Sequence, residues 1–132
     1  MTTESAAPGI VAVVVTYNRR ELLLECLDAI EAQTHPVSEI VLVDNASTDG
    51  TSEAIRDGHP HVTLYELDRN LGGAGGFAFG VAAARHHAGA IWLMDDDAAP
   101  RPDALEHLLA ARVRYPGPLP VVVASRVVSA DD

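Results

Sequence analysis

The sequence is short of cysteine and of basic residues, and each shortage excludes a class of protein. The single cysteine, Cys26, rules out a disulfide within the chain and suits a reducing compartment. Lys and Arg together number 9 against 19 Asp and Glu, so the formal net charge is −10. Proteins that bind nucleic-acid backbones need a basic face, which so acidic a chain does not offer. We therefore expect no nucleic-acid partner.

Long hydrophobic runs are also missing. The longest apolar runs have the length of strands and fall well short of the ~20 residues that cross a membrane. No basic segment followed by an apolar run opens the chain, so we expect no signal peptide, a flexible tail over residues 1–9 and a cytoplasmic location. Hydrophobic residues nevertheless make up 48% of the 132 residues, which is enough to form one compact domain over residues 10–132.

Short β-branched runs alternate with longer helical stretches along the chain. Strands are predicted over residues 10–15, 39–43, 62–67, 90–94 and 121–124. Helices are predicted over residues 21–33, from residues 49–51 to about residues 58–60, from residue 77 to about residue 88, and over residues 102–115. Alternation of this kind indicates an α/β fold in three layers, with helices on both faces of a mostly parallel, Rossmann-like sheet.

Polar residues follow four of the predicted strands. They are Thr16, Tyr17, Asn18 and Arg19, then Asp44 and Asn45, then Asp68, Arg69 and Asn70, then Asp95, Asp96 and Asp97. In open α/β sheets ligands bind beyond the carboxyl ends of the strands, and those ends meet at one edge. The sequence therefore predicts a polar ligand site at that edge.

The three consecutive aspartates are the sharpest feature of this predicted edge. If the chain stays extended, Asp95 and Asp97 point the same way and Asp96 points the other way. Two carboxylates with phosphate oxygens and water suit octahedral Mg²⁺ or Mn²⁺. The alternative is a solvated loop that caps the helix near Pro102. Because the triplet directly follows a buried-looking strand, we favour metal binding.

Residues 70–76 contain four glycines and open a predicted helix. Glycine lets the backbone approach a ligand closely, and a helix N-terminus attracts phosphate, although a tight strand-to-helix turn explains the glycines equally well. Asp44 ends an apolar strand, where a carboxylate can accept from a base or a ribose hydroxyl. By contrast His35, His59, His61 and His107 show no spacing typical of metal ligands.

Four segments, residues 13–19, 40–51, 70–77 and 95–97, resemble the family 2 glycosyltransferases in order and spacing. The sequence Asn-Leu-Gly-Gly-Ala-Gly-Gly-Phe with an aspartate triplet is most similar to the actinobacterial galactofuranosyltransferases of cell-wall galactan synthesis. The resemblance implies the GT-A fold and a metal-dependent, inverting transfer of a sugar. The implied donor is UDP-galactofuranose or dTDP-rhamnose, and the implied acceptor is a glycan or a lipid-linked glycan. It also allows a peripheral position at the inner face of the membrane.

The resemblance further implies residue roles. The implied nucleotide-sugar-binding residues are Thr16, Tyr17, Asn18, Arg19, Asp44, Asn70, Gly72, Gly73 and Asp96. Asp95 and Asp97 would hold Mn²⁺ or Mg²⁺ against the diphosphate of the donor.

In that family the acceptor-binding part and the catalytic base follow the matching segment. We therefore expect residues 10–132 to form the donor half, with weak donor binding, no catalytic residue of its own and no transfer by itself. An apolar face left by the other half would allow self-association. Two alternatives remain: a non-catalytic nucleotide-binding module, and a sugar nucleotidyltransferase. The latter normally carries a glycine-rich basic loop after its first strand, where this sequence has no glycine.

Overall fold

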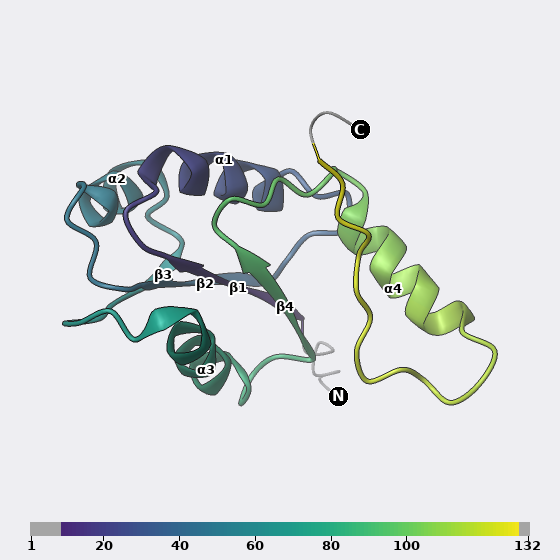
Figure 1. Cartoon of the computed structure of the whole chain (residues 1–132). Coiled ribbons are helices and arrows are strands. Elements are labelled where there is room, and N and C mark those ends of the chain that lie inside the picture. Colours follow the sequence, from purple (N-terminus) through teal and green to yellow (C-terminus); the bar gives the residue numbers. More distant parts are fainter. Residues whose placement is uncertain (1–8, 130–132) are drawn as a thin grey trace, which may run out of the picture.

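The computed structural model describes residues 9–129, which form one parallel sheet with helices around it. The strands are β1 (Ile10–Thr16), β2 (Glu39–Asp44), β3 (Thr63–Glu66) and β4 (Ala90–Asp95). They lie in the order β3-β2-β1-β4, and every neighbouring pair is parallel (Figure 1). This order puts the chain's first strand in the middle, with β2 on one side of it and β4 on the other.

Four helices complete the described fold: α1 (Arg20–Glu31), α2 (Thr51–Gly58), α3 (Gly72–Ala84) and α4 (Ala104–Arg114). α1 and α2 cover one face of the sheet, and α3 covers the other (Figure 1). The predicted three-layer α/β architecture is therefore confirmed. α4 lies beyond β4 and is attached through Gln33, whose side chain accepts from the backbone N–H of Leu105 and donates to the carbonyl of Arg101.

Strand periodicity explains why two separate hydrophobic cores form. Ala12, Val14 and Leu42 point toward α1 and pack with its buried side chains. Val13 and Val43 point the opposite way, toward α3. α1 has the matching pattern for a one-sided helix, since its buried positions are Leu23, Cys26, Leu27 and Ile30. Because β1 and β2 are covered on both faces, they read in sequence as unbroken apolar runs.

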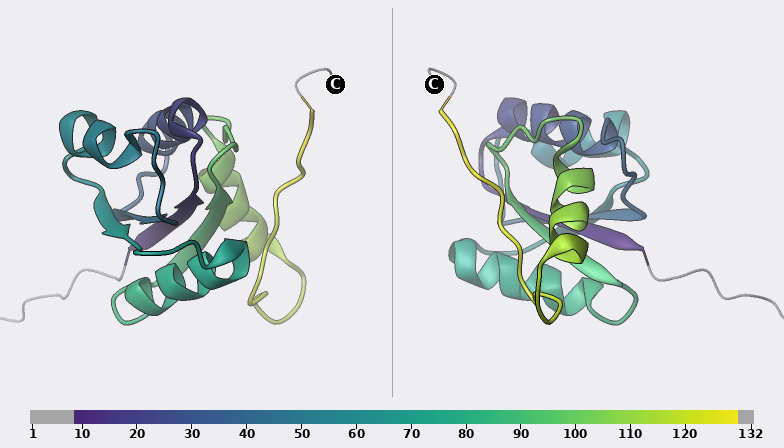
Figure 2. Two further views of the ribbon diagram at one scale, coloured as in Figure 1. Left: turned by 60° about the vertical axis from the view of Figure 1, so that its left-hand side comes forward. Right: turned by 90° about the vertical axis from the view of Figure 1, so that its right-hand side faces the viewer.

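The prediction of a fifth strand over residues 121–124 is wrong. This segment forms no regular structure, and Val121 and Val122 are 97% and 81% exposed. A β-branched run becomes a strand only where a neighbouring strand is available to pair with it. Here the Arg112 side chain donates to the carbonyl of Pro120 and holds the segment beside α4, away from the sheet (Figure 2).

The structure differs from the prediction at the start of α3, and the predicted N-terminal tail falls almost wholly outside the described residues. α3 begins at Gly72, so most of the glycine-rich stretch is helical and does not precede the helix as predicted. The tail predicted over residues 1–9 lies outside the described residues apart from Gly9, whose carbonyl accepts from Gly89. Among residues 9–129, no helix has both the length and the apolar character needed to cross a membrane.

Candidate functional site

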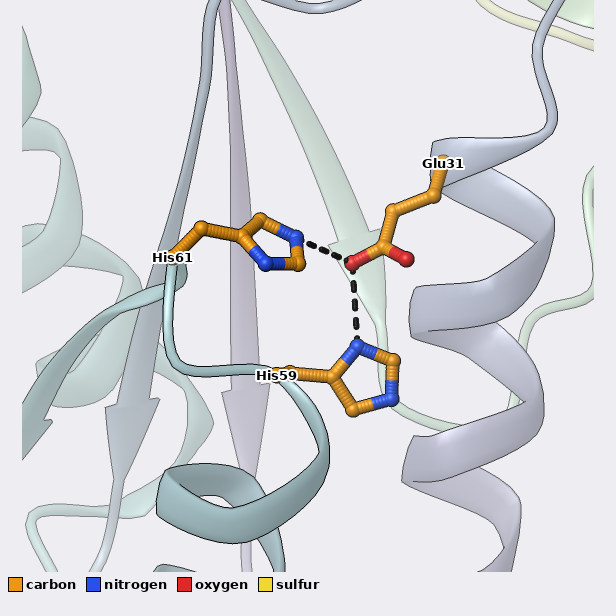
Figure 3. A group of neighbouring side chains, drawn as sticks. All are labelled: Glu31, His59 and His61. Carbon is orange, nitrogen blue, oxygen red and sulfur yellow. Dashed lines mark hydrogen bonds and ion pairs between the residues drawn. The ribbon is translucent and has the colours of Figure 1, made fainter.

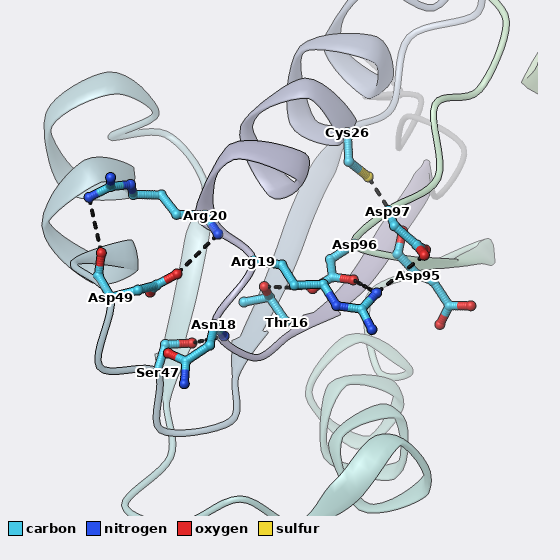
Figure 4. Close-up of polar contacts among 10 residues, drawn as sticks. All are labelled: Thr16, Asn18, Arg19, Arg20, Cys26, Ser47, Asp49, Asp95, Asp96 and Asp97. Carbon is cyan, nitrogen blue, oxygen red and sulfur yellow. Dashed lines mark hydrogen bonds and ion pairs between the residues drawn. The ribbon is translucent and has the colours of Figure 1, made fainter. Parts of the chain in front are cut away.

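The carboxyl ends of β1, β2 and β4 and the start of α3 surround a cleft of about 480 Å³. The predicted nucleotide-sugar-binding and metal-binding residues all line it except Asn18 and Asp44, and Val15, Asn45 and Phe77 line it as well. Asp68 and Arg69, which were also expected at this edge, do not line it. Figure 4 shows Thr16 and Arg19 directed at Asp96 across the ends of β1 and β4, with Arg19 also reaching Asp97, whereas the Asp95 side chain points away from them. The convergence expected at this edge of the sheet is thus present in the fold.

Asp96 is built into the protein, whereas its two neighbours face solvent. Only 5% of Asp96 is exposed, and its Oδ2 accepts from the Thr16 hydroxyl at 2.9 Å. The Arg19 guanidinium lies 3.4 Å from Asp96 Oδ1 and 3.2 Å from Asp97 Oδ2. The condition of an extended chain is not met here, because a turn closed by the hydrogen bond from Ala98 N–H to the Asp95 carbonyl follows β4. Because of this turn, the three adjacent carboxylates have different environments: Asp96 is buried, Asp97 contacts Arg19, and Asp95 is exposed.

The exposed aspartates fit the ligand set of a divalent cation. Within the described residues, the Asp95 carboxylate has no hydrogen bond or ion pair, and Asp97 has only the contact with Arg19. Mg²⁺ and Mn²⁺ prefer such hard oxygen ligands and usually complete their shell with phosphate oxygens and water. The three carboxylates do not by themselves converge on a single point. The residues therefore suit an ion that a bound diphosphate helps to hold.

The start of α3 forms the opposite wall of the cleft. Gly72 has φ +74°, and a Cβ at Gly72 or Gly73 would meet nothing within 4 Å. The Asn70 side chain accepts from Gly72 N–H at 2.8 Å and shapes this turn. A helix N-terminus carries partial positive charge and unpaired N–H groups, which favour an anion. The glycines thus leave open space where a phosphate can approach the backbone.

At the end of β2, the side chain that lines the cleft is that of Asn45 and not that of Asp44. Its Nδ2 donates to the Gly72 carbonyl at 3.1 Å, and its Oδ1 accepts from Leu71 N–H. The Asp44 carboxylate is 2% exposed and accepts from Ser47 N–H and the Ser52 hydroxyl. Alternation along β2 is the signal that separates these neighbours, because adjacent side chains point to opposite faces.

Asn18 lies beside the cleft and joins the loops after β1 and β2. It has φ 50°, its N–H donates to the Ser47 hydroxyl, and its Oδ1 accepts from Thr48 N–H. Asp49 strengthens this junction by accepting from Arg20 N–H and Thr51 N–H. Burial raises the pKa of Asp49, but the hydrogen bond from the Thr51 hydroxyl, together with those from the two backbone N–H groups, outweighs it and holds that pKa below its usual value. The loops that border the cleft are therefore braced from behind.

Cys26 lies in α1 behind the aspartates and is fully buried. Burial, followed by the negative charges of Asp96, Asp97 and Asp95, raises the pKa of this thiol to about 12. The thiolate is the nucleophilic and metal-binding form, so a thiol with this pKa is inert at neutral pH. Cys26 is therefore a core residue, packed in the cluster between α1 and the sheet.

Sequence reasoning missed one group of potential ligands. Glu31, His59 and His61 place their ligand atoms within 4.8 Å of one another. The spacing between histidines alone did not indicate a metal site at His59 and His61. The third potential ligand is Glu31, which lies 28 residues before His59 in the chain. The only local signal was the His-Pro-His sequence itself.

An all-parallel sheet with a carboxylate-rich cleft at its carboxyl edge places the chain among the Rossmann-like α/β proteins that bind ligands there. Sequence comparison then shows that it belongs to glycosyl transferase family 2, whose model matches residues 11–128. The fold class is that of the GT-A glycosyltransferases, as the resemblance implied.

Two similar curated relatives are mycobacterial. The galactofuranosyltransferase GlfT1 of Mycolicibacterium smegmatis is 43% identical over 67% of this chain and 30% of its own length. The protein of the same name from Mycobacterium tuberculosis is 41% identical over 81% of this chain and 36% of its own length. The chain thus spans about a third of the length of these relatives.

Solved structures agree with this assignment. The mannosyltransferase PcManGT of Pyrobaculum calidifontis, in complex with GDP-Man and Mn²⁺, has 35% identity and a TM-score of 0.65. The match covers 86% of this chain and 34% of that one. A TarS structure from S. aureus in complex with UDP has 26% identity and a TM-score of 0.61, with 77% of this chain and 31% of that one covered.

Proposed function

We propose that the cleft binds a nucleotide-diphosphate sugar together with Mn²⁺ or Mg²⁺, as the donor site of an inverting glycosyl transfer. The observation that carries this proposal is the charge of the cleft. Its lining residues include three carboxylates, Asp95, Asp96 and Asp97, and one basic residue, Arg19. A diphosphate would be repelled by this lining unless a divalent cation neutralised it. The Mn²⁺ and GDP-Man of the 35% identical mannosyltransferase support the same chemistry.

The two walls of the cleft have different proposed roles, one in binding the metal ion and the other in binding the diphosphate. Asp95 and Asp97 would hold the ion from the β4 side, and the N-terminus of α3 at Gly72 and Gly73 would face the diphosphate. A bound divalent ion acts as a Lewis acid and stabilises the nucleotide diphosphate as it departs. Arg19 now contacts Asp96 and Asp97, and its half-exposed guanidinium is free to turn toward a phosphate. The buried Asp96 and Thr16 pair keeps this end of β4 in place, and Asp96 would meet the ribose.

The nucleoside would lie toward Tyr17 and Asn45, at the ends of β1 and β2. Tyr17 is 47% exposed, so its ring is available to contact a base. The Asn45 amide is held by Gly72 and Leu71 in one orientation, which favours it as a fixed wall. Asp44 and Asn18 support the loops from behind the cleft, and we propose that their part in donor binding is indirect.

Galactofuranose is the donor sugar that we propose, linked to UDP. The support is the identity of 41% and 43% to two galactofuranosyltransferases across most of this chain. In an inverting transfer the acceptor hydroxyl attacks the anomeric carbon from the face opposite the leaving nucleotide diphosphate, and a base takes its proton. The acceptor would be a glycan or a lipid-linked glycan. No residue of the cleft is proposed as that base.

Calorimetry with nucleotides tests this function directly. UDP is expected to bind at least about tenfold more tightly in Mn²⁺ than in EDTA, since tenfold corresponds to about 1.4 kcal/mol and metal contacts to phosphate exceed that. UMP, which lacks the diphosphate, is the matched control and should gain little from Mn²⁺. GDP and dTDP measured under the same conditions report the base preference. Equal binding of UDP with and without Mn²⁺ would contradict the proposal.

A further inference from the structure

A second cluster of potential metal ligands lies at the opposite edge of the sheet from the cleft. α1 begins beside the cleft after β1 and runs back, so that Glu31 at its end reaches the amino edge of the strands. His59 and His61 lie between α2 and β3, at the same edge. Figure 3 shows both imidazole rings directed at the Glu31 carboxylate. The donor site does not use any of these three residues.

Distances define how closely the three side chains converge. His59 Nδ1 lies 2.9 Å and His61 Nε2 lies 2.6 Å from the same oxygen, Glu31 Oε1. The second carboxylate oxygen of Glu31 has no partner among the described residues. Partial burial raises the pKa of Glu31, but the hydrogen bonds from His59 and His61 outweigh it and lower that pKa overall.

We propose that Glu31, His59 and His61 form a Zn²⁺ site that clamps the end of α1 to the segment between α2 and β3. Two imidazoles and one carboxylate are a donor set that Zn²⁺ takes up readily, with water in the fourth position. Ligands of a tetrahedral Zn²⁺ lie about 3.3 Å apart, given bonds of about 2.0 to 2.1 Å. To reach this spacing, the His59 contact of 2.9 Å needs to lengthen by about 0.4 Å and the His61 contact of 2.6 Å by about 0.7 Å.

Asp28 is placed to orient the ring of His59 for metal binding. His59 would bind the ion through Nδ1, so its proton must sit on the other ring nitrogen, Nε2. Asp28 Oδ1 lies 3.5 Å from that Nε2 and is placed to accept the proton's hydrogen bond. Metal-binding histidines usually donate in this way to a carboxylate, which fixes the ring and its tautomer. His61 is 60% exposed in its side chain, which leaves the ion an entry path.

The clamp would act on stability and not on the donor site. A ligand that binds only the folded chain stabilises it in proportion to the logarithm of its concentration over Kd. The ion would join the end of α1 to the segment between α2 and β3, which the hydrogen bonds to Glu31 already hold together. Zn²⁺ binding and UDP binding are accordingly expected to be independent, so either proposal can fail without the other.

Zn²⁺ titration of the metal-free chain tests the site. Calorimetry in excess Mg²⁺, which fills carboxylate sites but competes poorly for imidazole, is expected to show one Zn²⁺ per chain. His61→Ala and Glu31→Gln should each weaken binding at least about tenfold and abolish the Zn²⁺-induced rise in Tm. His107→Ala is the matched control, because His107 also faces a carboxylate, that of Asp103 at 3.7 Å, but has no second histidine. This variant should bind Zn²⁺ like the parent.

Co²⁺ adds a spectroscopic reading of the ligands. Bound at this site it should give the visible absorption of a low-coordinate nitrogen and oxygen complex, and His61→Ala should lose it. His61 is mostly exposed, so this variant is expected to fold normally. Zn²⁺ binding that persists unchanged in both His61→Ala and Glu31→Gln would overturn the proposal. Equal weakening in His107→Ala would do the same, since it would indicate scattered surface histidines.

Discussion

Replacing Asp97 with alanine is expected to weaken UDP binding in Mn²⁺ by about tenfold to a hundredfold. Asp95→Ala should have an effect of the same size. Within the described residues the Asp95 carboxylate has no hydrogen bond or ion pair, and the Asp97 carboxylate contacts only Arg19, so each is available to an ion. The measurement is the UDP dissociation constant by calorimetry for the parent and both variants, in Mn²⁺ and in EDTA.

The change in UDP affinity measured in EDTA distinguishes the loss of metal coordination from misfolding of the variant. In EDTA the Asp97→Ala variant should bind UDP as well as the parent or better, because one negative charge beside the diphosphate is gone and Arg19 is released toward it. Asp68→Ala is the matched control, since Asp68 follows β3 and is exposed but does not line the cleft. Retention of the full Mn²⁺ effect in both cleft variants would contradict the assigned role, as would an equal loss in Asp68→Ala.

A valine at Gly80 is expected to lower the free energy of unfolding by about 3 kcal/mol or more, through overpacking of the core. α3 approaches the sheet so closely at this residue that a Cβ would lie 2.4 Å from Val13 Cγ1 and 3.2 Å from Val43 Cγ2. Both valines are fully buried and β-branched, so they have little freedom to turn aside. The helix must then move away from β1, and the start of α3 beside the cleft moves with it.

Alanine at the same position gives a graded test. Gly80→Ala gains up to about 1 kcal/mol of helix propensity but still meets Val13, so a net loss of about 1 kcal/mol is expected. Gly58→Ala is the control at the end of α2, where an added Cβ meets nothing within 4 Å. It should be neutral or stabilising by chemical denaturation. If Gly80→Ala were as stable as Gly58→Ala, the close packing of α3 on β1 would be disproved.

Elements with strong periodicity were predictable from the sequence, and so was the edge of the sheet that carries the site. The unbroken apolar runs at β1 and β2 follow from burial on both faces, and polar residues directly after them identify the carboxyl edge. Residues 121–124 show the limit of this reasoning. Four apolar residues in sequence indicate a strand, but only the fold determines whether a neighbouring strand is available to pair with it.

Side-chain partners at the site were less predictable than its position. A strand-end carboxylate such as Asp44 can face a ligand or cap its own loop. Alternation along β2 separates Asp44 from Asn45, but only the fold shows which of the two faces the cleft. The structure directs Asp44 to Ser47 and Ser52 and gives the cleft to Asn45. Contacts between segments that are distant in the sequence could not be predicted. Glu31 and His61 are 30 residues apart, and only the packing of α1 beside α2 brings them together.

The location of bound nucleotide tests the central claim most directly. In a ¹H–¹⁵N correlation spectrum of the chain, UDP with Mg²⁺ is expected to shift the amide signals of Thr16, Arg19, Asn45, Gly72, Gly73 and Asp95 to Asp97. Signals of Glu31, His59 and His61, at the opposite edge of the sheet, should stay in place. Shifts concentrated away from the cleft, or the same shifts with UMP and no metal, would contradict a diphosphate site built on the aspartates.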